Sequence, residues 1–361
     1  MDSFAFIIHP IDPKRDVSRK FPFLGRILPV PLINFFSTFF PPVYLSEIEG
    51  ITSQSTGKQI RGWLIACPLT AARMLELPQK VAYTKIIQTG RLAERLGAQI
   101  LGLGAFTSVV GDGGITIANA LDVPVTTGDA YTIAVAVDAV TQAAEQIGLP
   151  IQRTAAAVVG ATGAIGKVCS ELLAERVPEL YLISRDRQKL HELEQHLQLQ
   201  TRANIHISTD VRDLINAQII LTVSSAAQTI IEPEHLKPGS VICDVARPRD
   251  VSTQVAAVRK DVLVIDGGIV DVPGIVNFNF DFGFPAGKAY ACMAETMALA
   301  LDERFEDYTV GKDISRQRVN EIASIAKKHG FRLSGFRSFE KPVTEEQINE
   351  VRKFVSPASL E

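Results

Sequence analysis

Hydrophobic residues in the middle of the chain follow two alternating spacings. Short runs of small and β-branched apolar residues, bounded by turn residues, indicate buried strands. Between them lie segments whose apolar residues recur every three or four positions, as on one face of a helix. This alternation is typical of a parallel sheet with crossover helices, so we predict an α/β protein with a doubly wound sheet. The expected strands are residues 155–159, 180–184, 204–208, 217–223, 240–245 and 262–265, with helices at 167–174 and 189–197.

The first 150 residues mix strand-like and helix-like patterns. Their longest regular segment is an Ala- and Val-rich helix at 130–146, closed by Gly148 and Pro150. Because it is apolar on most sides, we expect this helix to be buried, and it could join two domains. The other expected elements are strands at 4–8, 60–66 and 99–103 and a helix at 79–96 that Gly97 ends.

Residues 21–43 form a Phe-rich segment that contains five prolines (FPFLGRILPVPLINFFSTFFPPV). A membrane-spanning helix needs about twenty continuous apolar residues, and the prolines and Arg26 argue against one here. Two interpretations stay open. The segment is either an irregular stretch packed on its domain or a peripheral contact with a membrane, since exposed aromatic segments need a partner.

Composition narrows the class of protein. The chain has 361 residues, about twice the usual domain length, which favours two domains. Its 37 basic and 40 acidic side chains provide no basic field for nucleic acid. The N-terminus lacks a basic region before its apolar run, so we expect no secretory signal. The four cysteines lack CxxC spacing, which argues against a disulfide framework or a zinc site. We expect a cytoplasmic protein without a metal, and membrane association is the alternative location.

A glycine-rich loop lies between an expected strand and an expected helix. Its glycines would permit a tight turn and bring a pyrophosphate close to the helix N-terminus, where free N–H groups point outward. Strand, loop, helix and second strand follow in the order of a Rossmann-type dinucleotide-binding unit. The loop residues expected to contact the cofactor are Gly160, Thr162, Gly163, Ala164, Ile165 and Gly166.

These patterns predict an organisation in three segments. Residues 1–150 would form a substrate-binding α/β domain and residues 151–284 the Rossmann domain. Helices are expected to dominate residues 285–361 and to pack back on the domains.

The end of the second expected strand indicates the cofactor. NAD-binding domains usually carry Asp or Glu at this position for the ribose 2′-hydroxyl. Here Ser184, Arg185 and Arg187 follow the strand, with Asp186 between the two arginines. Guanidinium groups bind phosphate by paired hydrogen bonds, so we predict NADPH.

Two further segments follow strands of the same sheet. Ligands of open α/β sheets lie at the carboxyl ends of the strands. We therefore expect Val223, Ser224 and Ser225 to line the cofactor site. Gly267 and Gly268 would let the backbone approach the nicotinamide end.

Cys292 is a candidate nucleophile. We expect it on a helix that begins near Pro285, where Lys288 would share its face and favour the thiolate. A small buried residue is the alternative, because free cysteine is among the most buried residue types. Cys67 is the rival nucleophile, whereas Cys169 and Cys243 fall in core positions of the expected Rossmann domain.

Taken together, the motifs resemble the cyanobacterial-type long-chain acyl-(acyl-carrier-protein) reductases, which form fatty aldehydes. The resemblance covers roughly residues 45–333. This family has Asn where the present chain has Asp129. The matching segments are Ile51-Thr52-Ser53 to Gly57, residues 102–108, Thr126-Thr127-Gly128-Asp129, residues 158–166, residues 266–270, Ala291-Cys292-Met293-Ala294-Glu295 and residues 328–332.

The resemblance implies a two-step reaction. In that family, the cysteine that matches Cys292 accepts the acyl group from a thioester. NADPH then reduces the enzyme-bound thioester to an aldehyde. Acyl-carrier protein or acyl-CoA would be the donor. Oxyanions need hydrogen-bond donors, and Thr107, Ser108 and Thr127 are the candidates.

Two other functions stay open. The first is another hydride-transfer enzyme, of the shikimate- or amino-acid-dehydrogenase type or like glutamyl-tRNA reductase, where Cys67 would be the nucleophile. The second is a catalytically silent nucleotide- or lipid-binding protein.

Overall fold

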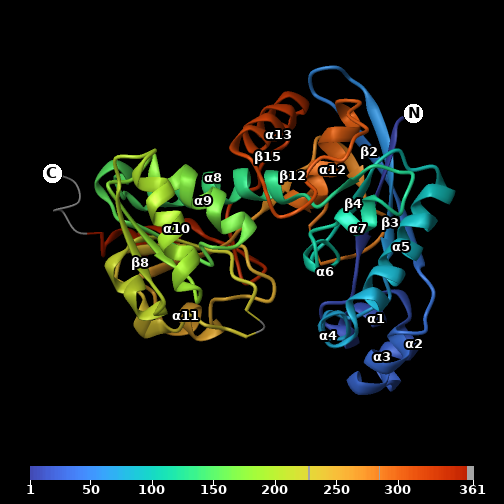
Figure 1. Cartoon of the computed structure of the whole chain (residues 1–361), viewed down its shortest axis with the longest axis horizontal. Coiled ribbons are helices and arrows are strands. Elements are labelled where there is room, and N and C mark those ends of the chain that lie inside the picture. Colours follow the sequence, from blue (N-terminus) through green and yellow to red (C-terminus); the bar gives the residue numbers. More distant parts are fainter. Residues whose placement is uncertain (227, 284, 356–361) are drawn as a thin grey trace. The chain divides into compact units, whose positions relative to one another are not determined.

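The computed structural model describes residues 1–226, 228–283 and 285–355 (Figure 1). The chain divides into two compact units. Unit 1 consists of Met1–Tyr131 and Val270–Arg332, and unit 2 of Thr132–Ile269 and Leu333–Glu361. The first passage between them lies within helix α8 (Asp129–Ile147). The other two lie within strands β12 (Ile269–Asp271) and β15 (Arg332–Leu333).

Unit 2 contains, within its described residues, a six-stranded sheet in the order β11-β10-β9-β6-β7-β8. All neighbouring strands are parallel, with Val159 opposite both Ile183 and Thr222. Two halves that diverge from a central pair are the Rossmann arrangement, which confirms the expected α/β fold class. The strands are β6 (Ala156–Val159), β7 (Glu179–Ile183), β8 (Asn204–Ser208), β9 (Ile219–Thr222), β10 (Ser240–Asp244) and β11 (Val262–Asp266).

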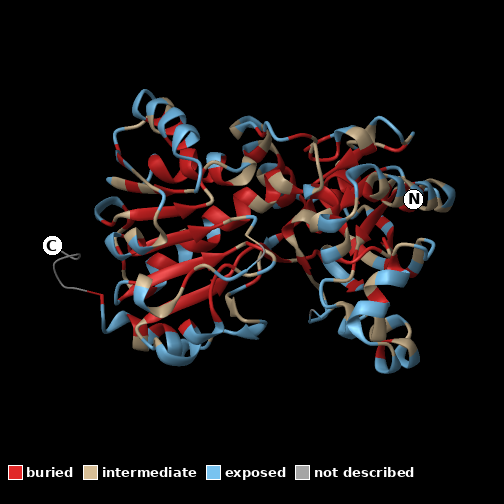
Figure 2. Ribbon diagram, turned by 60° about the horizontal axis from the view of Figure 1, so that its bottom comes forward, coloured by how far each residue is buried: buried red, intermediate tan, exposed pale blue. Residues whose placement is uncertain are grey.

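The central strands of this sheet are buried on both faces, as Figure 2 shows in red. One face packs against Leu214 and Val255, which come from two of the connecting helical segments. Covering both faces removes the hydrophobic–polar alternation, which explains the continuous apolar runs in the sequence. The helical segments of unit 2 are η1 (Ile151–Arg153), α9 (Ala164–Ala174), α10 (Arg187–Gln198), η2 (Val211–Asn216), η3 (Pro233–His235), α11 (Thr253–Val258) and α14 (Glu345–Arg352), and a hairpin is formed by β16 (Arg337–Ser338) and β17 (Lys341–Pro342).

Unit 1 has its own six-stranded sheet over the described residues, in the order β13-β2-β3-β1-β4-β5. Strands β3, β1, β4 and β5 are parallel, while β2 and β13 run antiparallel at one edge. The strands are β1 (Ser3–Ile8), β2 (Val43–Thr52), β3 (Gln59–Ala66), β4 (Leu101–Leu103), β5 (Val125–Thr126) and β13 (Gly274–Asn277). The other elements are α1 (Pro13–Lys20), α2 (Pro22–Ile27), α3 (Val30–Ser37), α4 (Ala71–Glu76), α5 (Gln79–Leu96), α6 (Phe106–Val109), α7 (Ile115–Ala118), β14 (Lys288–Tyr290), α12 (Ala291–Leu301) and α13 (Arg316–His329).

Two expectations need correction. The helix expected from Pro285 starts only at Ala291, because Lys288–Tyr290 form a strand. Residues 285–361 do not stay together as one segment: residues up to 332 belong to unit 1, and those from 333 to unit 2. By contrast, the helix at 79–96 is confirmed as α5, with Gly97 in a left-handed conformation at its end.

The Phe-rich segment is not irregular, because it contains the short helices α2 and α3. Most of its large apolar side chains are exposed, so it does not pack fully on its domain. No helix among the described residues is long and apolar enough to cross a bilayer.

Candidate functional site

The glycine loop lies at the carboxyl end of β6 in unit 2. Gly160 has φ +80°, and a β-carbon there would come within 2.9 Å of the N and Cα atoms of Ser224, which follows β9. A β-carbon on Gly166 would lie 2.1 Å from the Gly160 carbonyl oxygen. Both glycines are therefore required by close backbone packing. Because β6 and β9 are the central pair of the sheet, the loop lies at the topological switch point where such sheets bind ligands.

The start of α9 has the features of a phosphate-binding site. Its N-cap is Gly163, so no side chain caps the helix. The first N–H groups of α9 are then available to an anion, which the helix dipole also favours. Beside the loop, the Thr162 and Ser184 hydroxyls hydrogen bond at 2.6 Å. These groups fit the pyrophosphate and ribose of a dinucleotide.

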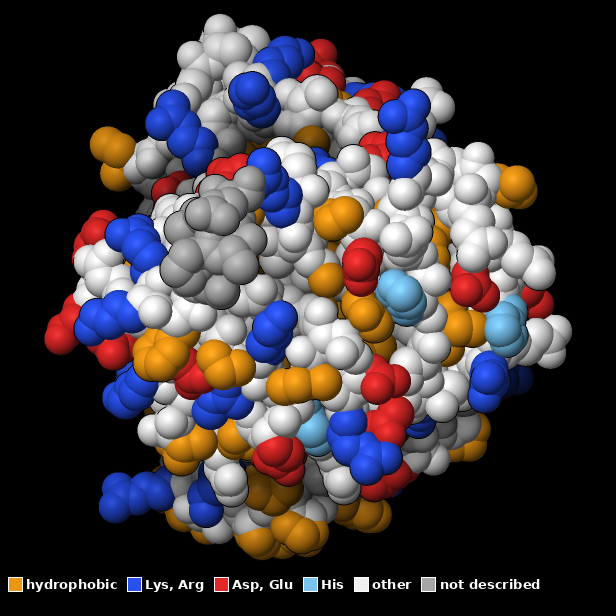
Figure 3. All heavy atoms as spheres, turned by 90° about the vertical axis from the view of Figure 1, so that its left-hand side faces the viewer, with side chains coloured by type: hydrophobic (Ala, Val, Ile, Leu, Met, Phe, Trp, Pro, Cys, Tyr) orange, Lys and Arg blue, Asp and Glu red, His pale blue; other side chains and the backbone are white. Residues whose placement is uncertain are grey.

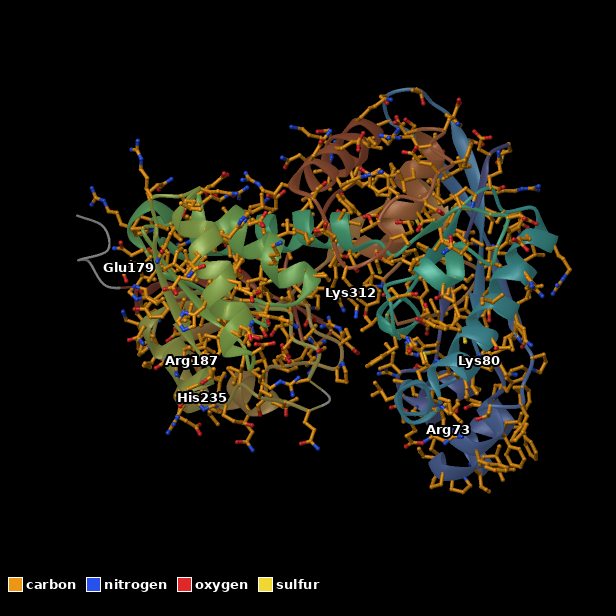
Figure 4. The ribbon with its side chains drawn as sticks, in the orientation of Figure 1. Arg73, Lys80, Glu179, Arg187, His235 and Lys312 are labelled. Atoms are coloured by element: carbon orange, nitrogen blue, oxygen red, sulfur yellow. The ribbon has the colours of Figure 1, made fainter. Side chains whose placement is uncertain are left out.

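The acidic residue between the two arginines has a structural role. Asp186 is the N-cap of α10 and accepts a hydrogen bond from the Lys189 amide at 3.1 Å. Arg185 and Arg187 are exposed on either side of it, and Figure 4 labels Arg187 at the start of α10. The carboxylate that would contact a 2′-hydroxyl in an NAD site is thus used for capping.

Ser224 is held by an acid that we did not predict. The buried carboxylate of Asp250 accepts hydrogen bonds from Ser224 N at 3.0 Å, from Ser224 Oγ at 2.5 Å and from the Thr222 hydroxyl. Asp250 lies six residues after Asp244, the last residue of β10. The charged residues that follow this strand were the feature of the sequence that could have indicated Asp250. Directly after the neighbouring strand β11, Gly267 N donates to the Asp244 carbonyl at 3.0 Å. Gly268 has φ +79° and open space around it.

Cys292 belongs to unit 1, where it is the second residue of α12. Among the four cysteines, all of which lie in the described part of the chain, Cys292 alone is partly exposed. The expected helix face shared with Lys288 does not exist, because Lys288 lies in β14. Its ammonium donates to Asp271 Oδ1 at 2.6 Å. Cys292 is instead in the first turn of its helix, where backbone N–H groups favour a thiolate.

Burial and the carboxyl groups of Asp129 and Glu295 oppose the formation of a thiolate at Cys292. Burial raises the pKa of the Cys292 thiol to about 12, and the negative charge of Asp129 adds to the rise. Asp129 is itself shifted, because burial and the nearby Glu295 raise its pKa to about 7. The cysteine therefore rests as a thiol, and its ionisation is sensitive to the charge on Asp129.

Glu295 fastens the Thr126–Asp129 segment to α12. Its carboxylate is fully buried and accepts hydrogen bonds from Thr126 Oγ1 at 2.5 Å, Thr309 Oγ1 at 2.7 Å and Tyr131 N at 2.8 Å. Two motifs that are far apart in the sequence thus meet beside Cys292. We did not predict Glu295; its only signal was an acid one turn after the cysteine.

The three candidate oxyanion donors differ in their partners. Thr107 Oγ1 donates to the Gly104 carbonyl at 2.8 Å, and Ser108 Oγ to the Ala105 carbonyl at 2.7 Å. Thr127 Oγ1 is buried and has no partner at hydrogen-bond geometry among the described residues. It lies close enough to Asp129 to lower the pKa of that carboxyl, so a ligand would compete with Asp129 for the Thr127 proton.

The rival nucleophile is deeply buried. Cys67 is 0% exposed, and burial raises its pKa to about 11. Cys169 and Cys243 are buried as expected, and burial also raises the pKa of each.

A hydrogen-bonded chain in unit 1 joins the first and last segments of the resemblance. Ser53 Oγ lies 2.8 Å from His329 Nδ1, and His329 Nε2 lies 3.0 Å from Asp302 Oδ1. The sequence of serine, histidine and aspartate in this chain of hydrogen bonds resembles a hydrolase triad. However, Ser53 is only 2% exposed, and its Oγ also accepts a hydrogen bond from the Thr56 amide at 3.2 Å. We interpret the chain as a structural clamp between the β2–β3 turn and the end of α13.

Comparison with known proteins gives matches of different extent. The sequence model of the Shikimate / quinate 5-dehydrogenase family matches residues 142–266. The chain is 32% identical over 307 residues to aminotransferase PigE of Serratia sp., covering 84% of this chain but only 36% of PigE. It is 28% identical over 346 residues to the long-chain acyl-[acyl-carrier-protein] reductase of Synechococcus elongatus, covering 91% and 98% of the two chains. Among solved structures, L-tryptophan dehydrogenase from Nostoc punctiforme aligns with a TM-score of 0.40 at 14% identity, over 91% of this chain and 80% of that one.

The matched dehydrogenase segment contains the glycine loop and all six strands of the Rossmann sheet. The topology and this match together support a nucleotide-binding domain of the shikimate-dehydrogenase-like type in this part of the chain.

Proposed function

We propose that this protein reduces a long-chain acyl thioester to a fatty aldehyde with NADPH, through an acyl group bound to Cys292. The observation that carries the proposal is the position of Cys292. It is the partly exposed cysteine, it lies in the first turn of α12, and the segment containing Thr127 is fastened beside it. The similarity to the reductase of Synechococcus elongatus over 91% of the chain supports the same assignment.

In the first step, the Cys292 sulfur attacks the carbonyl carbon of the donor thioester. The bond between that carbon and the carrier sulfur breaks, and the thiol proton ends on the departing carrier thiol. Covalent catalysis of this kind divides one difficult step into two easier ones. The carrier is acyl-carrier protein or coenzyme A.

The negative oxygen that forms during this attack needs donors. Thr127 is our first choice, because its hydroxyl is buried beside Asp129 and donates to no backbone carbonyl. Ser108 and Thr107 would each have to give up a bond to a backbone carbonyl. Lys288 contributes at most a distant charge, since Asp271 holds its ammonium.

NADPH, when bound, would supply a hydride to the carbonyl carbon of this thioester; the electron pair of the carbon–sulfur bond would return to the Cys292 sulfur as the aldehyde leaves. The chain's own residues would hold this cofactor. The loop from Gly160 to Gly166 and the N-terminus of α9 would bind the pyrophosphate, and Thr162 and Ser184 lie beside them. Arg185 and Arg187 would bind the 2′-phosphate, while Val223, Ser224, Ser225, Gly267 and Gly268 line the remainder.

Intact-protein mass spectrometry with palmitoyl-CoA, without cofactor, tests the proposal. The native chain is expected to gain one palmitoyl group, Cys292→Ala is expected to gain none, and Cys67→Ala serves as the matched control. Adding NADPH should discharge the adduct as an aldehyde. An adduct lost only in Cys67→Ala would move the chemistry to the other cysteine. No adduct from either palmitoyl-CoA or an acyl-carrier-protein thioester would leave an ordinary dehydrogenase or a silent binder.

A further inference from the structure

We propose that α2, α3 and the turn after them form a surface that binds anionic membranes. Large apolar side chains are unusually exposed here: Phe23 by 74%, Phe39 by 69% and Phe35 by 55%. Ile27, Val30, Leu32, Phe36 and Phe40 are also exposed on the same short stretch. We call residues 23–40 the aromatic surface. Figure 4 shows carbon-only side chains gathered around these helices.

The aromatic surface rests on an ordered base. Gly25 packs so tightly on α1 that a β-carbon there would lie 2.1 Å from Ser18 Oγ. Ile33 of α3 is itself buried. The exposed rings contact one another, with the Phe35 ring centroid 5.4 Å from that of Phe36 and 5.5 Å from that of Phe39. The side chains are therefore presented outward from a defined scaffold.

Polar contacts anchor the ends of this scaffold. Thr70 Oγ1 donates to Asn34 Oδ1 at 2.9 Å, and Arg73 donates to Thr38 Oγ1 at 3.3 Å. Lys85 Nζ donates to the Phe40 carbonyl at 2.9 Å. These bonds use the polar groups at the base and leave the outer side apolar. Arg73 and Lys80 of the neighbouring helices are labelled in Figure 4.

Charge distinguishes an anionic bilayer from other occupants. Residues 12–44 carry five basic and two acidic side chains, although the whole chain has a net charge of −3. Arg26 is exposed within the aromatic surface itself. Apolar and aromatic side chains bordered by basic residues are the composition of segments that lie in the membrane interface.

A second copy of the chain is a poorer occupant. In a two-fold dimer the same surface occurs on both partners, so the two excesses of positive charge would face each other.

On the face shown in Figure 3, in contrast to the aromatic surface, hydrophobic side chains lie among Lys, Arg, Asp and Glu, as on an ordinary surface. The short, proline-containing helices would lie in the headgroup region rather than span the bilayer.

Vesicle flotation tests this proposal without reference to the reaction. The full chain is mixed with vesicles of phosphatidylcholine alone or with about one third phosphatidylglycerol, at low and high salt. Binding to the anionic vesicles is expected, and salt should weaken it. The double variant Phe35→Ser/Phe39→Ser should lose at least about tenfold in partitioning.

Two matched variants complete the experiment. Leu199→Ser removes an apolar side chain that is 88% exposed in unit 2 and should leave binding unchanged. Arg26→Glu should weaken binding to anionic vesicles more than to neutral ones. Binding that is equal for the native chain and the double variant would overturn the proposal. So would an absence of flotation together with a dimer that the double variant abolishes.

Discussion

A β-carbon on Gly128 would lie 2.3 Å from the Cα atom of Cys292, and Gly128 has φ +78°. The segment that carries Thr127 and Asp129 therefore touches the first turn of α12 through backbone atoms, with no room for a side chain.

Gly128→Ala is expected to displace this segment from Cys292. Overlap with backbone cannot be relieved by rotating a side chain, so we expect a loss of about 2 kcal/mol or more in the free energy of unfolding. Chemical denaturation measures it. Gly57→Ala is the control, because Gly57 has φ +68° but nothing within 4 Å of a β-carbon. Its cost should be the backbone strain alone, about 1 kcal/mol. Equal losses for both variants would contradict the close contact.

Asp129→Asn should make Cys292 more reactive. The variant removes a negative charge that helps to raise the pKa of the thiol. Each unit by which that pKa falls gives about tenfold more thiolate at pH 8. The rate of iodoacetamide labelling at Cys292, read by peptide mass spectrometry, should rise by about tenfold. In the native chain Asp129 gains its charge as pH rises through about 7, so labelling should rise less steeply than thiol ionisation alone predicts. An unchanged rate in the variant would show that Asp129 does not control the thiol.

His9 should make the fold sensitive to acid. The ring is buried, and burial lowers its pKa to about 4. Its Nε2 accepts a hydrogen bond from the Phe106 amide at 3.0 Å, which requires the neutral ring. The unfolded chain takes up a proton near pH 6.5, before the folded chain does, so stability falls as pH drops below that value. Between pH 7 and pH 5 we expect a loss of about 2 kcal/mol from this residue. Urea unfolding of the native chain and of His9→Gln should differ in pH dependence by that amount, and parallel curves would contradict it.

Arg185→Ala and Arg187→Ala should change cofactor preference. Both side chains are exposed beside the capping Asp186, and we propose that they bind the 2′-phosphate. Titration calorimetry should show an NADPH Kd raised about tenfold by either variant, with the NADH Kd unchanged. Arg202→Ala, an exposed arginine of the same unit, is the control. If both cofactors weaken equally, or neither does, the 2′-phosphate assignment fails.

The sequence by itself determined the Rossmann unit. Its strands and helices are short local patterns, and Gly160 and Gly166 fall where turn chemistry requires them. The helix at 79–96, ended by Gly97, was predictable for the same reason. Strands buried on both faces are continuous apolar runs, so the six strands and the helices α9 and α10 could each be predicted from their own segment, whereas the short α11 was not predicted.

Only the tertiary structure decided the surroundings of Cys292. We expected a helix from near Pro285, yet Lys288–Tyr290 form a strand, and α12 begins three residues later than Lys288. The shifts in the pKa of Cys292 and Asp129 arise from burial and from charges on distant segments. The hydrogen bonds of Glu295 to Thr126 and of Asp250 to Ser224 join residues that are far apart in the chain. Such bonds produce no repeating pattern in the sequence. Likewise, the Phe-rich composition did not say which rings face solvent, because exposure depends on what the rest of the fold covers.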